Sequence, residues 1–174
     1  VKVTLMKNYI KNCLIHNFIM KKNLLAIVIF YFALTLSSYG AASSSSNGSS
    51  NYDKGAYLIK KAKKLEEKGK IEKANKRYKK ALDYLIKSNE KKPNQPDTLN
   101  YLGFALRKTG NFKEAEKYYL KGLSLKPDHP GINEYLGELY IQTNRINLAK
   151  ERLDVLKNCN CEEYNELKEL IENR

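Results

Sequence analysis

Apolar residues recur at helical spacing along most of the chain after position 52. Between positions 96 and 129 they trace two helical faces, whose members are Leu99, Leu102, Ala105, Leu106, Phe112, Ala115, Tyr119 and Leu123. Thr109, Gly110 and Asn111 separate these faces, and Gly110 can take the left-handed conformation that ends a helix. Asn111 followed by Glu114 matches a capping box for the next helix. The pattern predicts a helix-turn-helix hairpin.

The hairpin pattern repeats with a period of 34 residues. Positions that match at this offset are Leu102 and Leu136, Gly103 and Gly137, Gly110 and Asn144, and Ala115 and Ala149. Residues 130–161 are therefore expected to form another hairpin of the same kind. Small residues such as Gly103, Ala115 and Gly122 would let the backbones of two helices approach closely.

An earlier segment, residues 55–92, has similar internal spacing, with Lys61 where the pattern has Leu. Its matching positions are Leu58, Ala62, Leu65, Gly69, Ala74, Tyr78 and Ala81. The offset from Ala74 to Ala115 is 41 residues, which is seven more than the period of 34. Because seven residues make about two helical turns, we expect the second helix of this repeat to be longer and to end near Pro93.

Residues 162–174 predict one more amphipathic helix. Asn160 with Glu163 matches a capping box at its start. Its apolar side carries Tyr164, Leu167, Leu170 and Ile171. A stack of hairpins leaves an apolar face at its end, and a helix of this kind can cover that face.

The hairpin at residues 96–129 resembles the tetratricopeptide repeat (TPR) family. The family pattern W-x2-L-G-x2-Y, A-x3-F and P appears as Leu99-x2-Leu102-Gly103-x2-Leu106, Ala115-x3-Tyr119 and Pro127. Residues 130–161 follow the pattern with Asn133 at its first large position and Cys161 in place of the closing Pro. The resemblance implies an all-α, right-handed superhelix of about three helix-turn-helix hairpins, at residues 55–92, 96–129 and 130–161, with a C-terminal capping helix at residues 162–174.

The resemblance also implies a non-catalytic scaffold that binds a protein or peptide in a concave groove lined by the first helix of each repeat. The groove positions are Ile59, Lys63, Asn100, Phe104, Arg107, Lys108, Glu134, Glu138, Ile141 and Gln142. Basic residues dominate its first two thirds and acidic residues its last, so a bound peptide should be bipolar or pair its charges locally. Phe104 is the expected aromatic anchor. These residues do not reproduce the Lys/Asn/Arg arrangement with which some TPR domains clamp a terminal carboxylate.

The net charge of +13 is distributed unevenly. Lys and Arg number 15 against 6 Asp and Glu in residues 53–95, but 12 against 13 in residues 96–174. The basic first repeat is either a solvated helical surface or one that attracts an anionic membrane, a cell-wall polymer or an acidic protein. Nucleic acid is the weakest partner, because no base-reading motif accompanies the lysines. The alternative function is a structural or self-associating envelope subunit that attaches through this repeat.

Residues 20–42 have the order of a secretory signal peptide: Met-Lys-Lys, an uncharged segment at 24–36, then small residues at 40 and 42. Thirteen apolar residues span about 20 Å as a helix, less than a bilayer core. We therefore expect export, with a bacterial periplasm as the destination, and membrane anchoring if the leader is not cleaved. Residues 1–19 read as an over-extended start or a long n-region, and residues 43–52 as a Ser/Gly linker.

Residues that could carry chemistry are few. His129 lies in the predicted loop between repeats, where it is expected to be solvated, and no Ser, Cys or Asp accompanies it at a recognisable catalytic spacing. We therefore expect no enzyme activity, no cofactor and no metal site. Cys159 and Cys161 are separated by one residue and are interpreted as a disulfide, as small turn residues, or as a redox or intermolecular pair.

Overall fold

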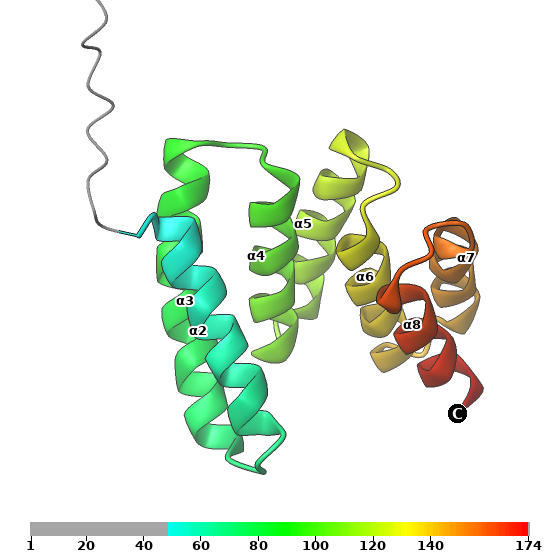
Figure 1. Cartoon of the computed structure of the whole chain (residues 1–174), viewed down its shortest axis with the longest axis horizontal. Coiled ribbons are helices and arrows are strands. Elements are labelled where there is room, and N and C mark those ends of the chain that lie inside the picture. Colours follow the sequence, from blue (N-terminus) through cyan, green and yellow to red (C-terminus); the bar gives the residue numbers. More distant parts are fainter. Residues whose placement is uncertain (1–48, 174) are drawn as a thin grey trace, which may run out of the picture. The chain divides into compact units, whose positions relative to one another are not determined.

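The computed structural model describes residues 49–173, and its regular structure there is entirely helical (Figure 1). The helices are α2 (Asn51–Glu66), α3 (Ile71–Lys91), α4 (Pro96–Lys108), α5 (Phe112–Leu125), α6 (Pro130–Gln142), α7 (Ile146–Leu156) and α8 (Glu162–Glu172). None of these helices is long and apolar enough to cross a membrane. The predicted leader at residues 20–42 and the segment 1–19 lie outside the described residues, as does most of the predicted linker at 43–52.

Consecutive helices pair as antiparallel hairpins, α2 with α3, α4 with α5 and α6 with α7, and each new hairpin packs on the one before (Figure 1). The turns within the hairpins place Gly69, Gly110 and Asn144 at equivalent positions with φ of 66°, 86° and 59°. The left-handed conformation expected of Gly110 is thus confirmed. Asn tolerates this conformation better than other residues with a Cβ, which explains how Asn144 replaces Gly in the last hairpin.

The helix starts differ from the predicted capping boxes. Asn111 makes no capping bond with its side chain, which instead donates to Thr109 Oγ1 at 3.3 Å. Asn160 has φ of 49° and lies in the turn before α8, so that Cys161 occupies the cap position. A complete capping box forms at α2, where Ser50 and Asp53 bond reciprocally. As a result α2 begins at Asn51, inside the segment expected to be a linker.

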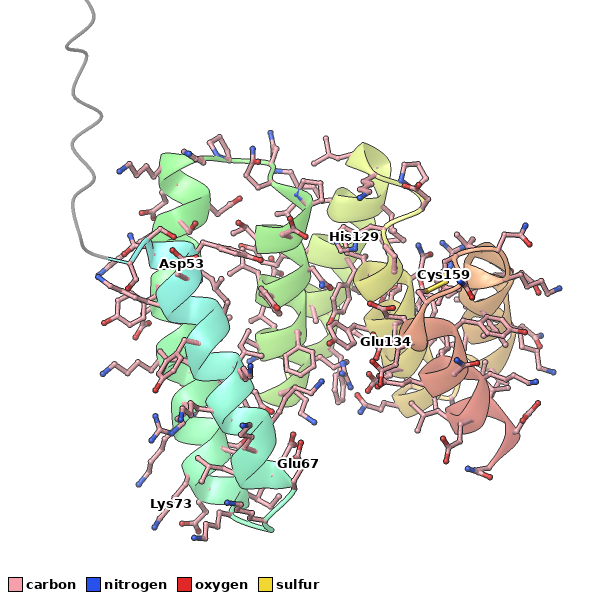
Figure 2. All side chains as sticks on the ribbon, in the orientation of Figure 1. Asp53, Glu67, Lys73, His129, Glu134 and Cys159 are labelled. Carbon is pink, nitrogen blue, oxygen red and sulfur yellow. A yellow bond between two sulfur atoms is a disulfide. The ribbon has the colours of Figure 1, made fainter. Side chains whose placement is uncertain are left out.

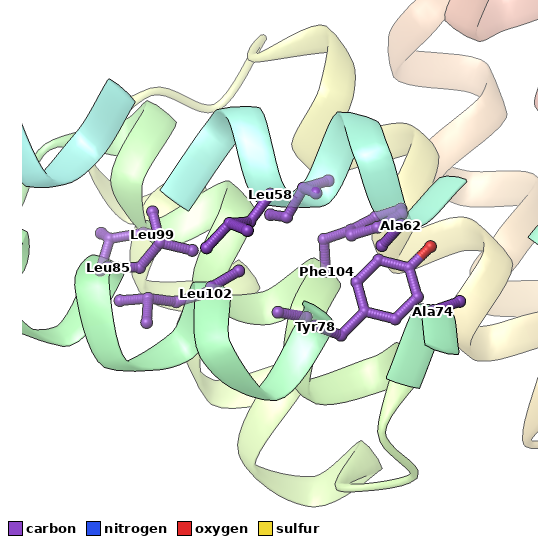
Figure 3. Packing of buried hydrophobic residues seen from close by; sticks show 11 residues of the cluster. Leu58, Ala62, Ala74, Tyr78, Leu85, Leu99, Leu102 and Phe104 are labelled. Carbon is purple, nitrogen blue, oxygen red and sulfur yellow. The ribbon is translucent and has the colours of Figure 1, made fainter. Parts of the chain in front are cut away.

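The second helix of the first repeat has the extra length that the spacing predicts. Helix α3 contains 21 residues and α5 contains 14. The added residues are 85–91, and among them Leu85 is fully buried, so it continues the apolar face formed by Ala74, Tyr78 and Ala81. They belong to the apolar cluster that joins the first hairpin to α4 (Figure 3).

Close contacts at glycine set the distance between stacked helices. A Cβ added at Gly103 would lie 2.5 Å from the ring of Tyr119, and one at Gly137 would lie 2.6 Å from Leu167 Cδ2. Both partner side chains are fully buried. Leu167 comes from α8, so α8 covers the last hairpin by filling the space over Gly137. The packing between these helices therefore depends on small residues on one helix facing large residues on the other.

Asn133 occupies a buried position at which the repeat pattern has a large residue. Its side-chain nitrogen donates to the carbonyl oxygens of Pro127 and His129 at 3.0 and 3.1 Å. Its oxygen accepts from Arg152 at 3.4 Å. These bonds satisfy the amide and make it acceptable in the core.

Truncation of Leu102 to Ala should destabilise the fold, because this side chain is 1% exposed within the first cluster (Figure 3). The free energy of unfolding should fall by about 2–5 kcal/mol in a urea titration followed by circular dichroism. Leu120→Ala is the matched control, since Leu120 is 49% exposed and its loss should cost less than about 0.5 kcal/mol. Equal effects of the two substitutions would contradict the described packing.

Candidate functional site

The first helices α2, α4 and α6 bring a set of aromatic and charged side chains together around Phe104. Its ring centre lies 4.7 Å from that of Tyr135 on α6 and 5.8 Å from that of Tyr78 on α3. Lys63 Nζ lies 5.8 Å from the Phe104 ring centre and 5.9 Å from that of Tyr135. The Arg107 guanidinium lies 5.3 Å from the Phe104 ring centre, and Lys108 Nζ lies 5.9 Å from it. Three cations thus surround one aromatic ring at distances typical of cation–π contacts.

Ion pairs join these cations to neighbouring helices. Lys108 Nζ lies 2.7 Å from Glu66 Oε1 on α2, and the Tyr78 hydroxyl donates to the other oxygen of the same carboxylate at 2.8 Å. Arg107 Nη1 lies 2.8 Å from Glu138 Oε2 on α6, and the Arg107 side chain is 1% exposed. Each pair therefore links α4 to one neighbouring first helix. Lys63 is exposed and reaches the surface beside them.

Glu134 on α6 is a buried acid, 3% exposed (Figure 2). Burial raises the pKa of its carboxyl to about 9, and a hydrogen bond with Glu166 of α8 and repulsion from Glu138 and Glu166 add to this, while Lys63 opposes it. Glu134 is therefore protonated at neutral pH, and its hydroxyl can donate to the Glu166 carboxylate. This hydrogen bond links α6, the first helix of the third hairpin, to the C-terminal helix α8.

The predicted groove residues divide by burial. Lys63 and Gln142 are exposed, and Lys108 and Glu138 are half-buried. The buried members are Ile59, Asn100, Phe104, Arg107, Glu134 and Ile141. Phe104, the predicted aromatic anchor, is 3% exposed and forms the floor beneath Lys63, Lys108 and Tyr135. We call the outer surface formed by Lys63, Lys108, Tyr135, Glu138 and Gln142 the first-helix surface.

Sequence reasoning missed Tyr135, although a usable signal was present. Tyr101 and Tyr135 are 34 residues apart, which is the repeat period. Each stands directly before the Leu-Gly pair of its repeat. Tyr101 packs on Tyr52 with ring centres 5.8 Å apart, as Tyr135 packs on Phe104. An aromatic residue at this position thus contacts the preceding first helix in both repeats.

His129 is 7% exposed, so the expectation of a solvated loop histidine is wrong (Figure 2). Its Nδ1 accepts from the backbone N–H of Ile132 at 3.3 Å and caps α6, which leaves Nε2 to donate to Asp97 on α4 at 3.0 Å. The histidine therefore connects the starts of two first helices. Both ring nitrogens have structural partners.

Cys159 and Cys161 form a disulfide bond in the turn between α7 and α8. Both residues are half-buried against the second apolar cluster. Within residues 49–173, no group of three or more His, Cys, Asp or Glu side chains could hold a metal ion.

Comparisons with known proteins agree with this architecture. The tetratricopeptide repeat family model matches residues 96–129. The Yersinia enterocolitica type III secretion translocator chaperone SycD is 17% identical, with 73% of this chain and 86% of SycD covered and a TM-score of 0.50. A tetratricopeptide repeat protein from Parabacteroides merdae is 18% identical at a TM-score of 0.48, with 70% of this chain and 59% of that chain covered. No curated protein matches the sequence.

The family match supports the resemblance to tetratricopeptide repeats at the hairpin that carries it most clearly. The likeness to SycD, at this identity, concerns the fold. The predicted fold class, an all-α stack of TPR-type helical hairpins, is confirmed for the described residues. The chain spans 59% of the length of the Parabacteroides merdae protein.

Replacing Glu134 by Gln should stabilise the protein at neutral and alkaline pH. The folded chain keeps this proton up to about pH 9, whereas an unfolded glutamate loses it near pH 4.5. Stability from the neutral carboxyl is therefore fully present below pH 4.5 and is lost as the pH rises towards 9. At pH 8 the variant should be more stable than the wild type by on the order of 1 kcal/mol or more, and the two should converge near pH 5.

Urea titrations from pH 5 to pH 9 measure this difference. Glu169→Gln, at an exposed position on α8, is the control and should leave the pH dependence of the wild type unchanged. Coincident profiles for the two variants would show that Glu134 is not held in its neutral form.

Proposed function

We propose that this protein is a non-catalytic scaffold that binds a peptide or protein segment on the first-helix surface. The observation that carries the proposal is the junction of α2, α4 and α6, where exposed Lys63 lies over the rings of Phe104 and Tyr135. Aromatic and cationic groups fixed by packing provide contact area at a low entropic cost. The family match at residues 96–129 supports an interaction role, because tetratricopeptide repeats are interaction modules.

The charges of this surface favour a ligand of mixed sign. Lys108 is paired with Glu66 and Arg107 with Glu138, so a strongly charged ligand of either sign would have to compete with an existing pair. Lys63 is exposed beside Tyr135 and can meet an acidic group of a ligand, while Glu138 is half-buried on the neighbouring helix. A peptide that crosses the first helices would therefore place acidic and basic side chains at different points along its length.

Action outside the cytoplasm forms the second part of the proposal. It rests on the signal-peptide pattern at residues 20–42. N-terminal sequencing of the protein from fractionated cells tests this part. A start at or after residue 41 supports export with cleavage. A start at or before residue 20 contradicts cleavage, and recovery of that form from the cytoplasmic fraction contradicts export.

A random peptide library displayed on phage tests the binding role, with the full chain as bait. Selected peptides should lose at least about tenfold in affinity for Lys63→Glu, because the substitution reverses the exposed charge over the two rings. Lys121→Glu on α5 is the matched control, since Lys121 is exposed outside the first-helix surface. Affinity for the control should stay within about twofold of the wild type.

Isothermal titration of three or more selected peptides provides the affinities. Enrichment of no peptide, or an equal loss for both variants, would contradict binding at this surface.

A further inference from the structure

The first and last helices of the described unit lie at opposite ends of the stack (Figure 1). At the first end, a groove of about 540 Å³ runs between α2 and α3, and we call its surroundings the N-terminal end face. Tyr57, Leu58 and Tyr84 form its apolar part, and its polar lining consists of Ser49, Asp53, Lys54 and Lys80. Tyr57 is 58% exposed, the largest value among the large apolar side chains of the described residues.

The N-terminal end face points away from the rest of the stack. Tyr52, Lys63 and Glu66 are among the α2 side chains that face α4, where they contact Tyr101, Phe104 and Lys108 respectively. Tyr57 and Lys61 lie elsewhere on α2, with Lys61 Nζ 5.3 Å from the centre of the Tyr57 ring. No described helix covers this face.

The N-terminal end face is strongly basic around its apolar centre. Lys54 Nζ lies 5.9 Å from the centre of the Tyr84 ring. One side of α3 carries four residues spaced three or four positions apart, which are Lys73, Arg77, Lys80 and Tyr84. A partner for this face must therefore offer an apolar hollow for Tyr57 and an acidic surface beside it.

The opposite end of the same molecule has both features. A groove of about 520 Å³ lies between α7 and α8, and Ile146, Leu153, Tyr164 and Ile171 supply its apolar lining. Lys150, Asp154, Lys168 and Glu172 line it with two charges of each sign. This groove and the outer side of α8 together form what we call the C-terminal end face.

Helix α8 makes the C-terminal end face acidic. Leu167 packs on Gly137 of α6, and at 100° per residue Glu162, Glu169 and Glu172 lie on the opposite side of α8. All three are exposed. Residues 157–173 contain five Glu against two Lys, whereas residues 53–95 contain 15 basic against 6 acidic residues. The two end faces are thus opposite in charge, and each has an apolar centre.

We propose that the N-terminal end face binds the C-terminal end face of a second copy of this chain. Tyr57 enters the α7–α8 groove of the partner copy, and Lys61 and Lys80 face Glu169 and Glu172. The two faces differ, so the contact is heterologous and leaves one face of each kind free to bind a further copy. The first-helix surface takes no part, so self-association and peptide binding are independent properties of the molecule.

A charge-swap experiment tests the contact by sedimentation velocity of the full chain in a density-matched non-ionic detergent. The wild type should self-associate at micromolar concentrations in about 0.05 M salt and dissociate as salt is raised to about 0.5 M. K61E/K80E and E169K/E172K should each raise the dissociation constant at least about tenfold. A mixture of these two variants should associate again, because each unaltered face meets its complement on the other variant.

K113E/K121E is the matched control, with two exposed lysines of α5 reversed, and it should associate like the wild type. A monomeric wild type at low salt, a control as impaired as K61E/K80E, or a mixture that stays monomeric would each overturn the proposal.

A photoreactive phenylalanine at position 57 locates the partner in cells that express the full chain in two isotopic labels. Mixed-label cross-links from position 57 to α7 or α8 support the contact. Cross-links only within one copy, to residues 1–48, or only to lipid or another protein would overturn it.

Discussion

The close approach of helix backbones at glycine is the constraint on which the structure depends. Gly103 accepts the ring of Tyr119, and Gly137 accepts Leu167, in each case at distances that leave no space for a Cβ. A single hairpin cannot bury its apolar side alone, so stability comes from stacking. Gly122 of α5 likewise accepts Ile132 of α6, so a glycine contact also sets the spacing of two successive hairpins and with it which side chains of their first helices meet.

Stacking converts isolated surface residues into contacts between repeats. Arg107 meets Glu138 only because α4 and α6 are adjacent, and Glu134 shares a hydrogen bond with Glu166 only because α8 packs on α6. These polar contacts lie next to the Phe104 and Tyr135 rings. As a result, several residues of the predicted groove are buried and do not face solvent. The surface that remains open is consequently rigid and nearly balanced in charge.

The sequence was sufficient to predict the repeat period, the hairpins, the long α3 helix and the positions of the first-helix residues. It was not sufficient to predict burial at the junctions between repeats. The loop position of His129 predicts a solvated side chain, and the repeat register predicts Phe104 at the groove, but both side chains are buried and contact side chains from an adjacent repeat. Periodicity describes one helix at a time, whereas the pKa of Glu134 is raised by burial and, beyond that, by a hydrogen bond with Glu166 on another helix, α8.

Hydrogen–deuterium exchange of the full chain tests the stacked architecture most directly. In a stack, the inner helices are held from both sides and the outer ones from one side. Amides of α4 and α6 should therefore exchange most slowly, and those of α8 and of the first turns of α2 most rapidly among the helices. Exchange of α4 and α6 at the same rate as α8, or within seconds throughout, would contradict an architecture in which each hairpin is stabilised by its neighbours.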